Sequence, residues 1–176
     1  MYTTSLTSIT FADDSSLNSI GSNAFYYTTN LTSINIPASV TSIGSNAFYE
    51  SGLTSITVDA SNNNYSSDEN GVLFNKDKTT LIQYLIGSTD SSYTIPKGVT
   101  SIGASAFRNA SALTSISIPA SVTSIGASAF KESGLNEVYI QNINTFNQDN
   151  STSFNHGEQS SFYGATSVTI TQELTS

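Results

Sequence analysis

Apolar and polar residues alternate in short segments of this chain. In the segment from Leu31 to Pro37, Ile34 and Ile36 alternate with polar residues. A period of two is typical of a half-buried β-strand, and β-branched residues favour strands. The proline directly after the second isoleucine ends the ladder, because it has no N–H group to donate. The pattern therefore predicts short strands that each turn one face to a core.

The same pattern recurs along the whole chain. The string Ile-Gly-x-x-Ala-Phe occurs four times, ending at Phe25, Phe48, Phe107 and Phe130. A fixed period of 20–50 residues indicates stacked units that share one continuous core. We therefore predict a single mostly β solenoid over residues 1–176, with about six to seven turns and repeats of 22–23 residues. The predicted turns are 6–30, 31–52, 53–89, 90–112, 113–134 and 135–164, followed by a partial turn at 165–176.

The recurring apolar residues define the predicted core. The four phenylalanines are expected to stack in one column, because stacked turns place equivalent residues above one another. A second buried column is expected at the first inward position of each strand: Ile34, Ile56, Tyr93, Ile116 and Val138. The glycine after the next isoleucine, as in Gly44 and Gly126, is expected to let the backbone reverse.

The third turn is longer than its neighbours. Its extra stretch contains two apolar runs that flank the polar residues Lys76, Asp77 and Lys78. Two such runs around a polar tip predict a β-hairpin. We expect this hairpin over about 71–86, projecting from the solenoid, with the charged tip as a candidate contact.

The unit Leu-x-x-Ile-x-Ile-Pro-x-x-Val-x-x-Ile-Gly-x-x-Ala-Phe resembles the BspA-like leucine-rich repeat family, also called type 5 or Treponema-type repeats. The resemblance covers essentially the whole chain. It implies a leucine-rich-repeat solenoid in extracellular or cell-surface proteins linked to adhesion, with no catalytic residues. The family usually has cysteine three residues after the phenylalanine, whereas this chain has Thr28, Ser51, Ala110, Ser133 and Ala165 there.

Composition narrows the classes of partner. Ser, Thr and Asn supply 33, 23 and 17 residues of the 176, and only 10% of residues are charged. The net charge of −8 repels nucleic acid and anionic lipid, so we expect neither nucleic-acid binding nor membrane insertion. The absence of cysteine excludes disulfides and thiolate metal sites. The N-terminus has neither the basic start nor the apolar core of a signal peptide.

The sequence offers little catalytic chemistry. The only histidine, His156, stands in a polar stretch typical of a solvated loop, and the acidic residues are scattered. Oxygen ligands for calcium occur at Asp59, Asn62, Asn64, Asp68 and Glu69, but their spacing matches no calcium loop. We expect no enzyme activity, no cofactor and no metal, with an enzyme kept as a remote alternative.

Two exposed surfaces are candidates for binding. The outward strand positions are expected to align in files: Ser33, Asn35, Ser55, Thr57, Ser92, Thr94, Ser115, Ser117 and Tyr139, with Ser8 and Thr10 in the same phase. Tyrosines after the column phenylalanines form a candidate edge: Tyr26, Tyr27, Tyr49 and Tyr163. Regular hydroxyl files also arise simply because repeats copy whatever solubilises a strand, and tyrosines also pack locally.

Two functions follow. The first is an adhesion module that binds a protein or glycan ligand. The alternative is a structural subunit that stacks head to tail into a filament through Leu6, Ile9, Val168 and Ile170, because unpaired strand edges favour strand addition. Four Asn-x-Ser/Thr motifs are candidate glycosylation sites: Asn30, Asn64, Asn109 and Asn150.

Overall fold

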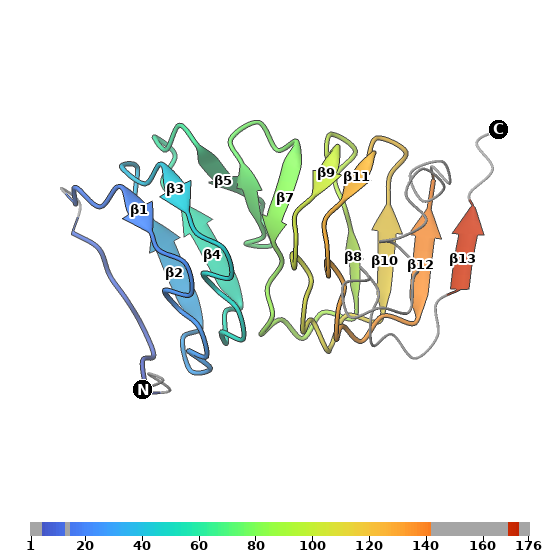
Figure 1. Cartoon of the computed structure of the whole chain (residues 1–176), viewed down its shortest axis with the longest axis horizontal. Coiled ribbons are helices and arrows are strands. Elements are labelled where there is room, and N and C mark those ends of the chain that lie inside the picture. The colour runs from blue at the N-terminus through green and yellow to red at the C-terminus, as the bar shows by residue number, and fades with distance from the viewer. Residues whose placement is uncertain (1–4, 13–14, 142–168, 173–176) are drawn as a thin grey trace. The chain divides into compact units, whose positions relative to one another are not determined.

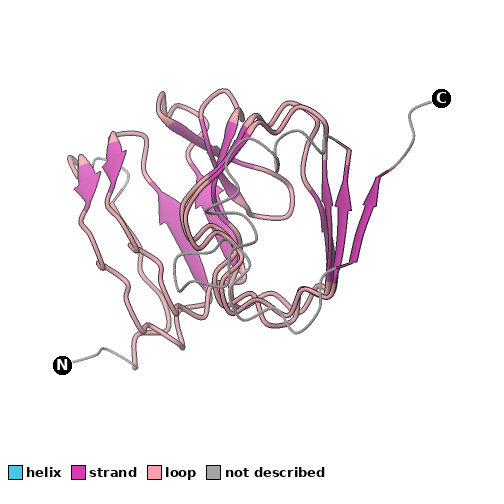
Figure 2. Cartoon of the chain, turned by 45° about the vertical axis from the view of Figure 1, so that its right-hand side comes forward, coloured by secondary structure: helices cyan, strands magenta, loops and turns pink. Residues whose placement is uncertain are grey.

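The computed structural model describes residues 5–12, 15–141 and 169–172, and for the last of these ranges it describes the backbone alone. All regular elements in these residues are strands, joined by turns (Figure 2). The strands are β1 (Ser19–Ile20), β2 (Ser33–Ile36), β3 (Ser42–Ile43), β4 (Ser55–Val58), β5 (Tyr65–Ser67), β6 (Leu73–Asn75), β7 (Thr80–Gln83), β8 (Ser92–Thr94), β9 (Ser101–Ile102), β10 (Ser115–Ile118), β11 (Ser124–Ile125), β12 (Glu137–Ile140) and β13 (Thr169–Gln172). The predicted mostly β solenoid is confirmed.

The chain divides into two compact units. The N-terminal unit comprises Met1–Lys78 and Gln83–Gly87, and the C-terminal unit comprises Thr79–Ile82 and Ser88–Ser176. In both units, a regular coil of the repeat contributes a longer strand and a two-residue strand, as β2 with β3 and β10 with β11. Equivalent strands of successive coils pair in parallel, as a solenoid requires.

In the N-terminal unit, β2 and β4 form a parallel ladder in which Ser33 pairs with Ser55 and Ile36 with Val58 (Figure 1). The short strands β1 and β3 pair in parallel in the same way. The strands β5 and β6 pair antiparallel, with Ser66 opposite Phe74. This pair interrupts the regular repeat between β4 and the next coil.

In the C-terminal unit, β8, β10, β12 and β13 lie side by side as a parallel ladder (Figure 1). Their register aligns equivalent repeat positions, so that Ile116 of β10 pairs with Tyr93 on one side and Val138 on the other. Strands β7, β9 and β11 pair in parallel as well, with Ile102 between Leu81 and Ile125. The ladder extends the repeat phase to residues 169–172.

The predicted core is confirmed in both units. Phe25 and Phe48 stack at 5.7 Å between ring centroids, and Phe107 and Phe130 stack at 5.0 Å. All four are buried, as are the residues of the predicted second column: Ile34, Ile56, Tyr93, Ile116 and Val138. The repeat therefore buries its apolar face by stacking equivalent residues.

The glycine after the second strand has a different role from the predicted reversal. A Cβ atom on Gly44 would meet the backbone nitrogen of Ser22 at 2.4 Å, and one on Gly126 would meet that of Ala104 at the same distance. The glycine is therefore required because the preceding coil approaches closely. The left-handed backbone lies two residues further on, in Asn46 (φ 54°) and Ser128 (φ 56°).

The long third turn contributes three strands, β5, β6 and β7, that are consecutive in one sheet, so the two predicted runs on either side of the tip are neighbouring strands. Strand β6 also pairs antiparallel with β5, where Tyr65 lies opposite Asn75, so the paired segment begins earlier than predicted. Strand β7 stacks in the repeat register, because Leu81 pairs with Ile102. Leu73, Phe74 and Leu81 are fully buried, because their apolar side chains join the cores instead of projecting into solvent.

The first predicted turn is also less regular than expected. Residues 5–12 form no strand, although the repeat phase places Ser8 and Thr10 at strand positions. Leu6 and Ile9 are nevertheless half-buried, so the apolar phase is retained without the ladder.

Candidate functional site

The outward files of the N-terminal unit form as predicted in register. Ser33 lies beside Ser55, and Asn35 lies beside Thr57. The Thr57 hydroxyl donates a hydrogen bond to Asn35 Oδ1 at 3.2 Å, so these side chains bond partly to each other. Three of the four are exposed, and Ser55 is half-buried.

The files of the C-terminal unit are longer. Ser92, Ser115 and Glu137 follow one another in one file, and Thr94, Ser117 and Tyr139 follow in the next. The Tyr139 hydroxyl donates to Glu137 Oε2 at 3.2 Å. The negative charge of Glu137, together with this hydrogen bond, raises the pKa of Tyr139. At β12 the two files therefore carry a hydrogen-bonded pair of side chains.

Threonines that precede the strands have a structural role that the sequence reasoning missed. The Thr54 hydroxyl donates to the carbonyl oxygen of Thr32 at 3.1 Å, and the Thr114 hydroxyl donates to that of Ser91 at 3.0 Å. Thr41, Thr100 and Thr123 make the same contact with the preceding coil. Many hydroxyls of this chain thus join neighbouring coils, and their recurrence one repeat apart was the available signal.

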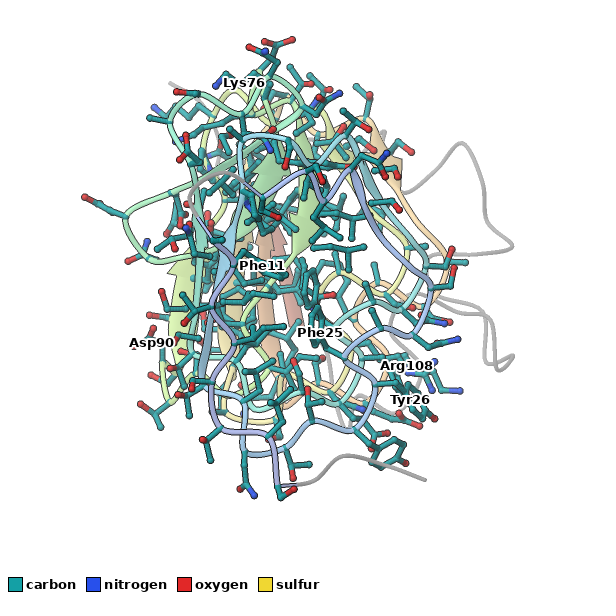
Figure 3. All side chains as sticks on the ribbon, turned by 90° about the vertical axis from the view of Figure 1, so that its left-hand side faces the viewer. Phe11, Phe25, Tyr26, Lys76, Asp90 and Arg108 are labelled. Carbon is teal, nitrogen blue, oxygen red and sulfur yellow. The ribbon has the colours of Figure 1, made fainter. Side chains whose placement is uncertain are left out.

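The tyrosine edge consists of Tyr26, Tyr27 and Tyr49 in the N-terminal unit. The rings of Tyr26 and Tyr49 stack at 5.1 Å and 12°, one coil above the other. The ring of Tyr27 stands edge-on to both, at 4.6 Å from Tyr26 and 6.5 Å from Tyr49. All three are half-buried, and Tyr26 lies at the periphery whereas Phe25 lies inside (Figure 3). Tyr163 lies outside the described residues.

Glu50 completes this edge. The pKa of Tyr27 is raised to about 12, chiefly because the Tyr27 hydroxyl donates a hydrogen bond to the Glu50 carboxylate and secondly because the hydroxyl is partly desolvated. Both residues have left-handed backbones, with φ of 58° for Tyr27 and 50° for Glu50. The backbone N–H of Tyr27 donates to the carbonyl oxygen of Tyr49 at 3.0 Å. The aromatic cluster is therefore held by the ladder, by ring contacts and by one carboxylate.

The predicted hairpin tip is anchored to the loop that precedes it. The Lys76 ammonium donates to the carbonyl oxygens of Ala60, at 3.3 Å, and of Asn62. Asp77 and Lys78 are exposed, and Lys78 has a left-handed backbone (φ 53°) that closes the turn. The structure places these three residues together but gives no sign of a ligand there.

Two of the residues with oxygen atoms suited to calcium, Asn62 and Asp68, serve as turn caps. Asn62 is fully buried: its Nδ2 donates to the carbonyl oxygens of Pro37 and Val40, and its Oδ1 accepts from the N–H groups of Asn64 and Tyr65. Asp68 Oδ1 similarly accepts from the N–H groups two and four residues ahead. Within the described residues, no group of three or more His, Asp or Glu side chains is placed to hold a metal ion.

The remaining candidate residues are dispersed. Leu6 and Ile9 are half-buried, Ile170 lies in β13, and Val168 falls outside the described residues together with His156 and Asn150. Asn30 and Asn64 are exposed, and Asn109 is half-buried. Among the described residues, no helix is long and apolar enough to cross a membrane.

A family model for the BspA-type leucine-rich repeat region matches six copies over residues 1–83 and 87–176. The chain belongs to the BspA-type leucine-rich repeat family. The predicted resemblance is therefore confirmed, and the leucine-rich-repeat solenoid with it. A comparison with curated protein sequences found no match.

Two solved structures have similar leucine-rich repeats. The pneumococcal vaccine antigen PcpA is 30% identical to this chain, with a TM-score of 0.64, and the match covers 74% of this chain and 35% of the PcpA chain. A leucine-rich cell surface protein from Faecalibacterium prausnitzii is 37% identical to this chain, with a TM-score of 0.62, and the match covers 72% of this chain and 33% of that protein's chain. The chain thus spans about a third of the length of these relatives.

Proposed function

We propose that this leucine-rich repeat is a non-enzymatic module of an extracellular or cell-surface protein, and that its tyrosine edge binds a protein ligand. The observation that carries the proposal is the half-exposed cluster of Tyr26, Tyr27 and Tyr49 on the ladder. The similar chains, which include a cell surface protein and a vaccine antigen, support the location.

The chemistry of the cluster suits a protein interface. Tyrosine supplies a large apolar area with one polar end, and it loses little conformational freedom on binding because it has two side-chain torsions. Here the rings are already fixed by stacking at 5.1 Å and by the Tyr27–Glu50 hydrogen bond. A preorganised aromatic surface reduces the entropic cost of association.

Binding assays with paired variants test the tyrosine edge. Purified chain would be titrated against a panel of extracellular matrix proteins by biolayer interferometry. The variant Tyr26→Ala/Tyr49→Ala is expected to weaken any detected binding at least about tenfold, because truncated tyrosine anchors cost about 2 kcal/mol or more. The matched control Arg108→Ala/Lys131→Ala changes the same repeat positions in the C-terminal unit. Equal loss in both variants would contradict the assignment.

Self-association is a second candidate, and one observation favours it. Among the described residues, β2 has a single strand partner, β4, so its other edge has no partner strand. Such an edge accepts a strand from another copy, and a head-to-tail contact of this type forms an open filament. Sedimentation velocity over a range of concentrations tests this: growing species support the filament, and a monomer at the highest concentration excludes it.

A further inference from the structure

A hollow of about 230 Å³ lies near the ends of β2 and β4 in the N-terminal unit. Its lining includes Phe11, Asn35, Pro37, Ala38, Ser39 and Asp59. The Ser39 hydroxyl lies 2.9 Å from the carbonyl oxygen of Ser15 and 2.7 Å from that of Leu17, to which it donates. This contact ties the segment before β1 to the loop after β2. The hollow is therefore built from two coils held together by hydrogen bonds.

The hollow combines an apolar surface with a donor and an acceptor. Phe11, on the segment that precedes β1, is half-buried and supplies an aromatic ring (Figure 3). Asn35 Oδ1 already accepts from Thr57, which leaves the amide NH2 group to donate. Asp59 Oδ1 accepts from the Ser61 N–H at 2.8 Å, which leaves Oδ2 to accept.

The size and charge of the hollow restrict its ligand. A volume of about 230 Å³ is below the roughly 300–1,000 Å³ of sites for drug-sized ligands, so one small ring fits better than an extended chain. Among the described residues that line the hollow, none carries a cationic side chain, which disfavours an anion.

We propose that this hollow binds one neutral sugar ring, as the terminal residue of a glycan. A sugar hydroxyl both donates and accepts, so adjacent hydroxyls satisfy Asp59 Oδ2 and the Asn35 amide together. The C–H face of the ring packs against the Phe11 ring, since both surfaces are apolar. This inference rests on the proposed function of the chain as a binding module, and it adds a glycan site separate from the tyrosine edge.

The equivalent positions of the C-terminal unit lack this combination. In the strand register, Ser117 of β10 occupies the position that Asn35 occupies in β2. Gln141, directly after β12, occupies the position that Asp59 occupies directly after β4. Gln141 Oε1 accepts from the backbone N–H of Ala120 at 3.3 Å. Asn35→Ser and Asp59→Gln therefore place residues that the repeat already accommodates, which makes them suitable test variants.

Saturation-transfer difference NMR with defined probes tests the site. Methyl glycosides of glucose, galactose, mannose and N-acetylglucosamine at about 10 mM are expected to give transfer from the protein for at least one sugar. Asp59→Gln, Asn35→Ser and Phe11→Ala are each expected to weaken that binding at least about tenfold. The matched control Ser117→Ala in the C-terminal unit should leave it unchanged. Circular dichroism of each variant verifies that the fold is retained.

Three results would overturn the proposal. The first is that no saturation is transferred from the protein to any neutral glycoside. The second is glycoside binding that survives all three substitutions. The third is saturation transfer to a charged probe alone. Transfer to lysine methyl ester alone would assign the hollow to an amine, and transfer to N-acetylneuraminic acid alone would assign it to an anion. The two proposals can fail separately. If no glycoside binds but a matrix protein still binds through Tyr26 and Tyr49, the proposed function stands and only the sugar site is removed.

Discussion

The two units present different edges on the same backbone. In the N-terminal unit, Tyr27 N–H donates to Tyr49 O at 3.0 Å, and in the C-terminal unit Asn109 N–H donates to Lys131 O at 3.0 Å. The tyrosine edge thus corresponds to Arg108, Asn109, Lys131 and Glu132, where Arg108 Nε and Glu132 Oε2 lie 3.5 Å apart. The ladder accepts an aromatic or a charged edge without changing its hydrogen bonds. Edge residues are therefore available for function in a way that core residues are not.

The largest expected effect is in the shared core. Phe107 is fully buried between Phe130 and Tyr93, whereas Phe25 is 8% exposed. Phe107→Ala is expected to lower the free energy of unfolding by about 3–5 kcal/mol, and Phe25→Ala by less, because its site is less enclosed. Urea denaturation measures both. A loss under about 1 kcal/mol for Phe107→Ala would contradict the stacked column.

Asn62 tests a second difference, because the regular repeat has valine there. Val40, Val99 and Val122 stand at the equivalent position. Asn62→Val is expected to cost about 2–3 kcal/mol, because two carbonyl and two N–H groups lose their side-chain partner in a buried site. Thermal unfolding measures the change, and Val122→Ala is the apolar control. A neutral Asn62→Val would show that water replaces these bonds.

Exchanging the edges tests the comparison directly. Tyr26→Arg/Tyr49→Lys gives the N-terminal unit the residues of the other edge, and a loss of only about 1 kcal/mol is expected from the broken ring contacts. The reverse exchange, Arg108→Tyr/Lys131→Tyr, is expected to be tolerated equally, because the backbone hydrogen bonds are the same. Unfolding of either variant at room temperature would show that the edge side chains determine the fold.

Titration compares the Tyr27–Glu50 pair of the N-terminal unit with the Tyr139–Glu137 pair of the C-terminal unit. Tyr27 has a pKa of about 12 against an ordinary 10.0, so its contribution to stability is fully present below pH 10 and is lost as the pH rises toward 12. Glu50→Gln is expected to lower this pKa, and Glu137→Gln to lower that of Tyr139, because each removes a negative charge. Tyrosinate absorbance against pH measures both shifts. An unchanged titration in Glu50→Gln would contradict the Tyr27–Glu50 hydrogen bond.

The sequence predicts the fold well because the repeat constrains every coil in the same way. Phe48 and Ile116 are recognised as core residues because each recurs in register and must stack on its equivalents. Irregular segments carry no such signal. The pairing of β5 with β6 and the stacking of β7 depend on which partners are near in space, and the loop at 71–86 is compatible with more than one pairing.

Sites were harder to predict than the fold, for a physical reason. The outward files could be aligned from the period alone, as the register of Asn35 and Thr57 shows. Whether a hydroxyl of these files is free depends on partners one coil away, and the Thr57 hydroxyl donates to Asn35 Oδ1. The hollow beside Phe11 arises from the irregular segment before β1, where the repeat gives no prediction of backbone position.

The smallest expected effect concerns the position three residues after each phenylalanine. In the C-terminal unit, the Ser133 hydroxyl donates to the carbonyl oxygen of Phe130 at 2.7 Å, whereas the buried Ser51 hydroxyl has no hydrogen-bond partner among the described residues. Ser133→Ala is expected to cost about 1 kcal/mol, because a hydrogen bond is lost. Ser51→Ala is expected to be neutral or slightly stabilising, because it removes an unsatisfied buried hydroxyl, and Ala110 shows that alanine fits this position. Equal losses in parallel urea titrations would show that the Ser51 hydroxyl rotates to bond its own coil, as the Thr28 hydroxyl bonds the carbonyl oxygen of Phe25.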